Sequence, residues 1–323
     1  MPRLKELVER EDRLTGGHRL CGGCGASIAA RQILLACDAP VVMSCATGCL
    51  EVATTIYPYT AWKMSFIHNA FENSAATIAG VESAYQALKR RGKTGKDIKF
   101  VGFGGDGGTY DIGIQALSGA MERGHDMLYV CYNNEAYMNT GVQRSSATPL
   151  GGNTTTSPVG SVIPGKTQRQ KDLTAVMAAH NIPYAAQANA GNWRDLTSKA
   201  EKAFTIEGPC FLNVLTPCPL GWIHEAHETV EICRLSADTC FWPLYEVANG
   251  EWRLTYKPKE KLPVTAYLEK QGRFRHLARE PNQPIIDEAQ AFIDEQWERL
   301  LIRCGEEELL EKHRAEQEAE EPE

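Results

Sequence analysis

Several features that would decide the class of this protein are missing from its 323 residues. No run of about 18 apolar residues occurs, so a membrane-spanning helix is not expected. The first residues, MPRLKELVEREDRLTGGHRL, carry charges throughout and lack the apolar segment of a secretion signal. We therefore expect a cytoplasmic protein that does not bind a membrane.

An excess of positive charge is also missing. The formal net charge is -7, and residues 306–323 alone hold nine acidic side chains against Lys312 and Arg314, which is again -7. The rest of the chain is therefore close to neutral. Because nucleic-acid binding depends on basic surface that displaces counterions from phosphates, we do not expect a nucleic-acid partner. The acidic tail is interpreted as the solvated end of a helix.

Apolar residues make up 43% of the chain, enough for one large core and an extension. Short apolar runs predict buried strands at 41–44, 98–103, 127–132 and 210–215. Helical patterns lie at 73–91, 110–123 and 172–180. This alternation predicts an α/β fold, namely a doubly wound, mostly parallel sheet with helices on both faces.

The second half of the chain contains less regular patterns. Residues 145–167 are rich in Ser, Thr, Gly and Pro, and loops of that length tend to be functional. The string WPLYEVANGEWRLTY predicts a β-hairpin with its turn at Asn249-Gly250. Residues 285–314 predict one amphipathic helix. We divide the chain into a main domain, an extension, and a C-terminal helix with an acidic tail, at 1–228, 229–284 and 285–323.

Eleven cysteines are many for a chain without a secretion signal, and a disulfide framework is not expected in a reducing compartment. Four of them are candidate ligands, in the strings CGGC, TGC and TPCP: Cys21, Cys24, Cys49 and Cys218. Four thiolates suit a structural zinc or an iron–sulfur cluster, and the spacing alone also allows cysteines that only fill space. The others lie in apolar surroundings and are predicted to be buried: Cys37, Cys45, Cys131, Cys210, Cys233, Cys240 and Cys304.

A glycine-rich turn follows the predicted strand at 98–103. The string KFVGFGGDGG ends in Gly105, Asp106, Gly107 and Gly108, and a predicted helix begins near residue 110. Free N–H groups at the start of a helix favour a phosphate. Asp106 would hold a divalent metal that neutralises a diphosphate. The alternative is an Asp-Gly turn that binds nothing.

The next predicted strand makes the phosphate hypothesis more specific. It ends in NNEAY, which places Asn134 28 residues after Asp106. One strand–helix–strand unit brings both strand ends to the same edge of a parallel sheet. A carboxylate, an amide oxygen and the backbone carbonyl of Ala136 form a set of hard oxygen ligands suited to Mg²⁺.

GDGG followed by NN at this spacing is similar to the diphosphate-binding motif of thiamine pyrophosphate enzymes. The string NEAYMNTGVQ, residues 134–143, resembles the corresponding loop of the 2-oxoacid:ferredoxin oxidoreductases. Further matches are GHRLCGGCGASIAARQ, ATGCLEVATTIYPYTAWK, IHNAFENSAATIAGVE, TPCPLGW, WPLYEV and QGRFRHL. The resemblance covers roughly residues 15–280 and favours a [4Fe–4S] cluster over zinc.

The resemblance implies the thiamine-diphosphate-binding fold of the type that holds the diphosphate, and it assigns residues by position. Cluster ligands are Cys21, Cys24, Cys49 and Cys218, with Cys49 also near the thiazolium ring. Mg²⁺ ligands are Asp106, Asn134 and the Ala136 carbonyl. The cofactor is lined by Cys49, Gly105, Asp106, Gly107, Gly108, Asn134, Glu135, Ala136, Tyr137, Met138 and Asn139. Asn139 is expected to contact the 2-oxoacid, and Ala26 stands where single-chain members have a glutamate that touches the cofactor.

The implied protein is the beta subunit of an enzyme that converts pyruvate to acetyl-CoA and CO₂ and passes electrons through the cluster to ferredoxin. Its implied partners are alpha, gamma and ferredoxin-like delta subunits, with pyruvate and coenzyme A as substrates. The glutamate that activates thiamine is expected from the alpha subunit, because Glu72 and Glu135 follow motifs of the diphosphate side.

Three alternatives stay open at this point. The first is the same chemistry on 2-oxoisovalerate, 2-oxoglutarate, indolepyruvate or oxalate. The second is a zinc-stabilised α/β binding protein whose glycine loop is only structural. The third is catalysis by His68, His224 or His227, although the last two are more typical of a surface helix.

Overall fold

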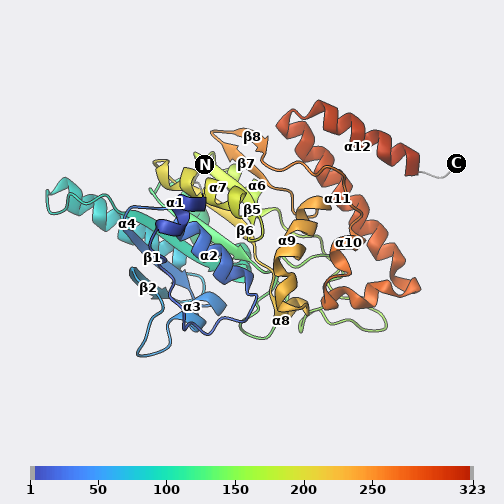
Figure 1. The fold of residues 1–323 in the computed structure, drawn as a ribbon, viewed down its shortest axis with the longest axis horizontal. Helices are drawn as coiled ribbons and strands as arrows, with labels where there is room; N and C mark the ends of the chain where they lie inside the picture. Colours follow the sequence, from blue (N-terminus) through green and yellow to red (C-terminus); the bar gives the residue numbers. More distant parts are fainter. Residues whose placement is uncertain (1–3, 321–323) are drawn as a thin grey trace.

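The computed structural model describes residues 4–320 and is built on one eight-stranded sheet (Figure 1). The strand order is β2-β1-β3-β4-β6-β5-β7-β8. Neighbouring strands from β2 to β5 in that order are parallel, and β7 and β8 add an antiparallel hairpin at one edge. The strands are β1 (Val41–Ala46), β2 (Ser65–Asn69), β3 (Lys99–Gly105), β4 (Leu128–Asn133), β5 (Tyr184–Asn189), β6 (Cys210–Leu215), β7 (Tyr245–Ala248) and β8 (Glu251–Leu254).

Helices cover both faces of this sheet. The first eight are α1 (Leu4–Glu9), α2 (Gly25–Leu35), α3 (Cys49–Thr54), α4 (Ser74–Arg90), α5 (Ile114–Glu122), α6 (Leu173–Ala178), α7 (Trp193–Thr205) and α8 (Pro219–Trp222). The remaining α-helices are α9 (Thr229–Asp238), α10 (Thr265–Leu268), α11 (Gln283–Cys304) and α12 (Glu307–Glu320). A π-helix, η1 (Gly107–Ile112), precedes α5, and three 3₁₀ helices are η2 (Ala226–Glu228), η3 (Gly272–Ala278) and η4 (Glu280–Asn282).

Two apolar layers hold the sheet between these helices. On one face, α2 and α7 pack on β1, β3, β4, β5 and β6 through buried residues such as Ile33 and Leu196. On the other face, α4, α5 and α6 bury Ile78, Leu117 and Met177. Every residue of β4, β5 and β6 is buried, as expected for parallel strands covered on both sides. The predicted doubly wound, mostly parallel sheet is confirmed.

Some elements of this sheet were not predicted. Strand β5 has the sequence YAAQAN, in which alanine, glutamine and asparagine have little intrinsic preference for strands. Strand β2 lies at the edge of the sheet and is only partly buried, so its pattern is weak. Helices α2, α3 and α7 were also missed. The helix predicted at 110–123 begins earlier, because the π-helix η1 occupies 107–112 before α5.

The C-terminal part extends the sheet and then covers one end of it. The predicted hairpin is confirmed, with left-handed φ angles of 50° at Asn249 and 85° at Gly250, as a type I′ turn requires. A third apolar cluster joins β7 and β8 to Trp222, Tyr267 and Trp297. Figure 1 shows α10, α11 and α12 gathered at one side of the molecule.

The single helix predicted at 285–314 is wrong, because the chain forms two helices there. Gly305 has a left-handed φ of 65°, and its N–H donates to Ile302 O at 3.2 Å. The N–H of Glu306 donates to Leu301 O at 3.0 Å, which completes a glycine C-cap and ends α11. Helix α12 then packs against α11. Within residues 4–320, no helix combines the length and apolar character needed to cross a membrane.

Candidate functional site

The carboxyl edge of the parallel strands gathers most of the predicted site residues. Cys49 follows β1, Asp106 follows β3, Asn134 follows β4 and Cys218 follows β6. Ligands of open α/β sheets bind outside this edge, because the loops after parallel strands converge there. The fold therefore brings together residues that lie up to about 170 positions apart in the chain.

Asp106 is the buried centre of this edge. Its side chain is 0% exposed, Oδ2 accepts a hydrogen bond from Ser145 Oγ at 2.5 Å, and Oδ1 accepts one from Asn134 N at 3.2 Å. Burial raises the pKa of Asp106 to about 7 in spite of these hydrogen bonds. A cation bound beside the carboxylate would reverse that cost, because it stabilises the ionised form.

The amide of Asn134 reveals how a cation would fit. Its side-chain oxygen lies 2.9 Å from Asp106 Oδ1 and 2.9 Å from the backbone oxygen of Ala136. If the amide is turned over, the same positions become two hydrogen bonds from its NH₂ group. In the present orientation the Asn134 oxygen faces two other acceptor oxygens with no proton between them. Two ligands at right angles on Mg²⁺, each 2.0–2.1 Å from the metal, are about 2.9 Å apart, so this spacing fits a divalent cation.

A cavity of about 270 Å³ opens at the same edge. Eight predicted residues line it: Cys49, Gly105, Gly107, Asn134, Ala136, Tyr137, Met138 and Asn139. Sequence reasoning missed the other lining residues: Thr47, Gly48, Phe71, Tyr132 and Thr140. A Cβ atom on Gly107 would lie 2.6 Å from the ring of Tyr137, so the turn approaches that ring only because the residue is glycine.

Glu135 was predicted to line the cofactor, and the structure places its side chain elsewhere. It is 0% exposed and absent from the cavity lining. Its carboxylate pairs with Arg273 and accepts a hydrogen bond from Gln170 Nε2 at 3.0 Å. Asp106 and Gly108 are also absent from the lining, and both are buried.

The four candidate cysteines lie in one region, and Cys49 among them lines this cavity. The turn that carries Cys21 and Cys24 lies against the segment before Cys218, because Gly25 N donates to Pro217 O at 3.1 Å. Burial and, to a smaller degree, repulsion by Cys218, Cys24 and Cys21 raise the pKa of Cys49 to about 12. The four thiols therefore lie within electrostatic range of one another. Among residues 4–320, no three His, Cys, Asp or Glu side chains are close enough to hold one metal ion.

The remaining cysteines mostly follow the prediction that they are buried. Six of the seven are buried: Cys37, Cys45, Cys131, Cys210, Cys233 and Cys240. Cys304 is an exception, because the last turn of α11 leaves it half-buried. None of the seven lines the cavity.

The histidines do not support catalysis at this edge. His68 pairs through Nδ1 with Glu51 Oε1 at 2.5 Å, and His224 contacts Glu225 O through Nδ1 at 2.9 Å. His227 is exposed in η2. None of these three lines the cavity.

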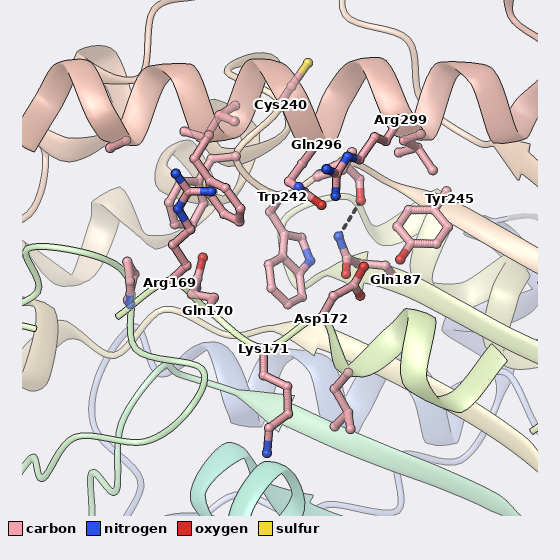
Figure 2. Close-up of a pocket in the computed structure, with 18 of the residues that line it drawn as sticks. Arg169, Gln170, Lys171, Asp172, Gln187, Cys240, Trp242, Tyr245, Gln296 and Arg299 are labelled. Atoms are coloured by element: carbon pink, nitrogen blue, oxygen red, sulfur yellow. Dashed lines mark hydrogen bonds between the residues drawn. The ribbon is translucent and has the colours of Figure 1, made fainter. Parts of the chain in front are cut away.

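A second cavity, of about 130 Å³, lies beneath α11 (Figure 2). Figure 2 shows Arg169 and Gln170 facing it from the loop before α6, and Gln296 and Arg299 facing it from α11. None of the predicted site residues lines it. One lining residue, Gln170, is the hydrogen-bond donor to Glu135, so this cavity adjoins the interior side of the Asn134 loop.

Comparison with known proteins agrees with this geometry. Residues 46–214 match the family model of the thiamine pyrophosphate enzyme C-terminal TPP-binding domain. The chain is 52% identical to pyruvate synthase subunit PorB of Thermotoga maritima, over 92% of this chain and 94% of that relative. It is 41% identical to ketoisovalerate oxidoreductase subunit VorB of Pyrococcus abyssi, over 90% and 93%.

A solved structure has the same fold. It is the 2-oxoglutarate:ferredoxin oxidoreductase from Magnetococcus marinus with 2-oxoglutarate, coenzyme A and succinyl-CoA bound. The TM-score is 0.53 at 20% identity, covering 69% of this chain and 79% of that one. The sequence relatives, matched over nearly their whole length, establish more than this fold. The chain belongs to the thiamine pyrophosphate enzymes and, among them, to the beta subunits of the 2-oxoacid:ferredoxin oxidoreductases.

Proposed function

We propose that this subunit binds the diphosphate of thiamine pyrophosphate through Mg²⁺ and carries a [4Fe–4S] cluster, in an enzyme that oxidatively decarboxylates pyruvate. Coenzyme A takes the acetyl group and ferredoxin takes the electrons. The observation that carries this proposal is the meeting of three acceptor oxygens, from Asp106, Asn134 and Ala136, at the edge of a cavity that Cys49 also lines.

The chain's own residues bind and orient the cofactor. Asp106, Asn134 and the Ala136 carbonyl would hold Mg²⁺, whose charge neutralises the diphosphate. Backbone N–H groups of the turn at 105–108 are available to phosphate oxygens. Phe71 and Tyr137, whose ring centroids are 5.5 Å apart, give the cavity an apolar wall that excludes water. The bound thiamine supplies the carbanion chemistry, which no side chain of this cavity can provide.

The four cysteines are proposed to hold a cluster rather than a single zinc, because the chain belongs to a ferredoxin-linked family of oxidoreductases. Zinc–sulfur bonds of about 2.3 Å place tetrahedral thiolates about 3.8 Å apart. In a cubane cluster each thiolate binds a different iron, so the four sulfurs are more widely spaced. The four thiols lie within electrostatic range of one another, so together they could serve such a cluster. A cluster held partly by Cys49 would lie beside the cavity, where electrons have a short path out.

The cavity lacks the carboxylic acid that activates thiamine, and this supports the proposal that a partner subunit supplies it. No aspartate or glutamate is among the lining residues of the described chain. Glu135 is paired with Arg273 in the interior, and Glu72 is exposed outside the lining. The glutamate that activates thiamine would therefore come from an alpha subunit, across an interface that also closes the cavity to water.

Pyruvate is the proposed substrate because the identity to a pyruvate synthase subunit, 52%, exceeds the 41% to a ketoisovalerate subunit. Asn139 is exposed at the cavity mouth, where it would contact the 2-oxoacid. A panel of 2-oxoacids tests this choice in the assembled enzyme. We expect the highest kcat/KM with pyruvate, and a higher value with 2-oxoisovalerate would reassign the substrate.

The central experiment compares the activity of the isolated chain with that of the hetero-oligomer. The hetero-oligomer and the isolated, cluster-reconstituted chain are prepared anaerobically and assayed for pyruvate-dependent dye reduction. We expect brown preparations that contain iron and sulfide, with turnover only in the assembly. Equal turnover by the isolated chain would contradict the subunit assignment. A colourless protein with stoichiometric zinc would contradict the cluster.

A further inference from the structure

The residue between the two converging ligands of the Asn134 loop has an unusual backbone. Glu135 has a left-handed φ of 64°, a conformation that residues other than glycine seldom adopt. It separates Asn134, which contributes an amide oxygen, from Ala136, which contributes a carbonyl oxygen. Any change in the backbone angles of Glu135 rotates the adjoining peptide groups and moves these two oxygens relative to each other. Such a residue persists in a strained state only when its surroundings hold it there.

Four contacts hold Glu135 in place. Its N–H donates to Asn133 Oδ1 at 2.9 Å, and its carbonyl accepts from Thr148 Oγ1 at 2.7 Å. Its carboxylate accepts from Gln170 Nε2 at 3.0 Å and forms a short ion pair with the guanidinium of Arg273. The first two contacts are neutral hydrogen bonds, and the third joins a neutral amide to the carboxylate. The ion pair joins two side chains that are 0% and 3% exposed, so it is the strong and directional contact.

Arg273 reaches this position from η3, in the C-terminal part of the chain. Its own guanidinium is fixed by Gln271 Oε1, at 2.9 Å from Nε and 2.7 Å from Nη2. It also stacks on the ring of Trp222, whose centroid is 4.0 Å away. The indole Nε1 of Trp222 donates to the backbone oxygen of Asn134 at 2.7 Å. Trp222 and Arg273 therefore hold the Asn134 loop at two adjacent residues.

We propose that Arg273 is a positioning residue of the metal–diphosphate site. Through its ion pair with Glu135 and its stacking on Trp222, it sets the backbone geometry that aims the oxygens of Asn134 and Ala136 at one cation. This inference rests on the proposed Mg²⁺ site. A pair of apolar side chains would fill the same space without the desolvation cost of two buried charges. The ion pair instead specifies one loop geometry.

The same contacts connect the metal loop with the four cysteines. Trp222 ends α8, which begins directly after Cys218, and its N–H donates to Cys218 O at 2.8 Å. Gly272, beside Arg273, donates from its N–H to Ile223 O at 3.0 Å. The segment from Cys218 to Ile223 is therefore held between the metal loop and η3. Loss of the Arg273 ion pair should act on the metal loop first, because none of its contacts is made to a cysteine.

The test uses the assembled enzyme and the variant Arg273→Met, which keeps an unbranched apolar side chain and removes the charge. Binding of thiamine pyrophosphate is measured by calorimetry across a series of Mg²⁺ concentrations. We expect the half-saturating Mg²⁺ concentration to rise on the order of tenfold, because outer partners of metal ligands typically change metal affinity by that much. Iron content should stay at the wild-type value. Arg273→Lys should recover part of the affinity.

The matched control is Arg275→Met, on the same 3₁₀ helix with an exposed side chain that donates only to Gly272 O, at 3.1 Å. It should leave the Mg²⁺ dependence unchanged. If Arg273→Met does not assemble, Glu135→Gln tests the same link from the other side, because it keeps the hydrogen-bonding shape and loses the charge.

The outcomes separate this inference from the proposed function. A lower melting temperature for Arg273→Met with an unchanged half-saturating Mg²⁺ concentration would make the ion pair merely structural and would overturn the inference. The same unchanged value in Glu135→Gln would overturn it too. If the wild-type enzyme itself binds thiamine pyrophosphate without any dependence on a divalent cation, the proposed metal site fails and the inference fails with it.

Discussion

The proposed metal–diphosphate edge, around Asp106, differs from the region of the four cysteines in how far its side chains are buried and hydrogen-bonded. At the first, Asp106 is 0% exposed and receives hydrogen bonds from Ser145 and from the backbone of Asn134. At the second, Cys21 is exposed and the other three thiols are only partly buried. Burial, and then repulsion by the other three cysteines, raises the pKa of Cys49 to about 12, so ionised thiols are disfavoured here without a cation.

The first site is therefore preorganised by the protein. At the second, ionised thiols would need the positive charge of a bound ligand. At the first site hydrogen bonds hold the Asp106 carboxylate, and the buried Glu135–Arg273 pair lies beside Asn134 and Ala136, so a cation would meet groups that are already in place. The thiols at the second site come from three segments that a cluster would tie together. Substitutions should therefore affect the two regions in different ways.

The largest effect is expected from Cys218→Ser. Three thiolates leave one iron without a protein ligand, so the cluster becomes labile and most of the iron and sulfide should be lost. Cys233→Ser is the control, because Cys233 is fully buried in the core on the α2 and α7 face. Iron and sulfide are measured in both variants and in the wild type. Equal iron content in Cys218→Ser and the wild type would show that Cys218 is not a ligand.

Asp106→Ala should abolish Mg²⁺-dependent binding of thiamine pyrophosphate and leave iron content unchanged. Asp106 is the only carboxylate among the three converging oxygens, so its loss removes the charge that attracts the metal. Calorimetric titration of the assembled enzyme measures this. Asp106→Asn keeps an oxygen for Ser145 and should bind weakly. Wild-type affinity in Asp106→Ala would mean that the turn does not hold the cation.

Gly221→Ala should perturb both regions at once, because Gly221 lies between them. An added Cβ would be 2.2 Å from Met138 Sδ, in the cavity lining, and 3.5 Å from Cys218 Sγ. Crowding of this kind costs about 1–3 kcal/mol, which should lower the melting temperature and also reduce cofactor affinity and iron retention. The control is Gly80→Ala in α4, where nothing lies within 4 Å and a stabilisation of roughly 0.5–1 kcal/mol is expected. A fall in melting temperature with both ligands bound normally would show that the two regions are independent here.

The smallest effect is expected from Asn139→Ala. This side chain is exposed at the cavity mouth, so its loss should leave the fold, the iron and the cofactor affinity unchanged. Loss of one hydrogen bond to the substrate corresponds to roughly a tenfold fall in kcat/KM for pyruvate. Steady-state kinetics across several 2-oxoacids measures it. Unchanged kinetics with every substrate would exclude Asn139 from substrate contact.

The preorganised region was also the more predictable one. Gly105 to Gly108 and Asn134 each follow a strand with a clear apolar pattern, so their meeting follows from one strand–helix–strand unit. Phe71 was missed because it lies in the loop after β2, an edge strand whose weak pattern was not recognised. Thr47 lies in the loop after β1, where only Cys49 attracted attention. Glu135 was placed in the lining because its neighbours are there. Its left-handed backbone, which turns the side chain inward, leaves no signal in the sequence.

The four cysteines were predictable only in part. Their spacing allowed a cluster, a zinc site or simple packing, and the resemblance to a family was needed to choose. The contacts that bring Cys218 beside the turn at Cys21 and Cys24 depend on how β6 lies relative to α2. That arrangement is a property of the whole sheet, so no local pattern reports it.

By itself, the sequence determined the doubly wound sheet, the glycine-rich turn with Asp106, and the hairpin at Asn249-Gly250, because each depends on residues that are close along the chain. Only the tertiary structure decided that Arg273 meets Glu135 across 138 positions and that α11 ends at Gly305 with α12 packed against it. Such contacts arise from the packing of whole elements, whose free energy is spread over many buried side chains. If the proposed role of Arg273 holds, the backbone geometry of the Asn134 loop is set by a part of the chain that carries none of the proposed ligands.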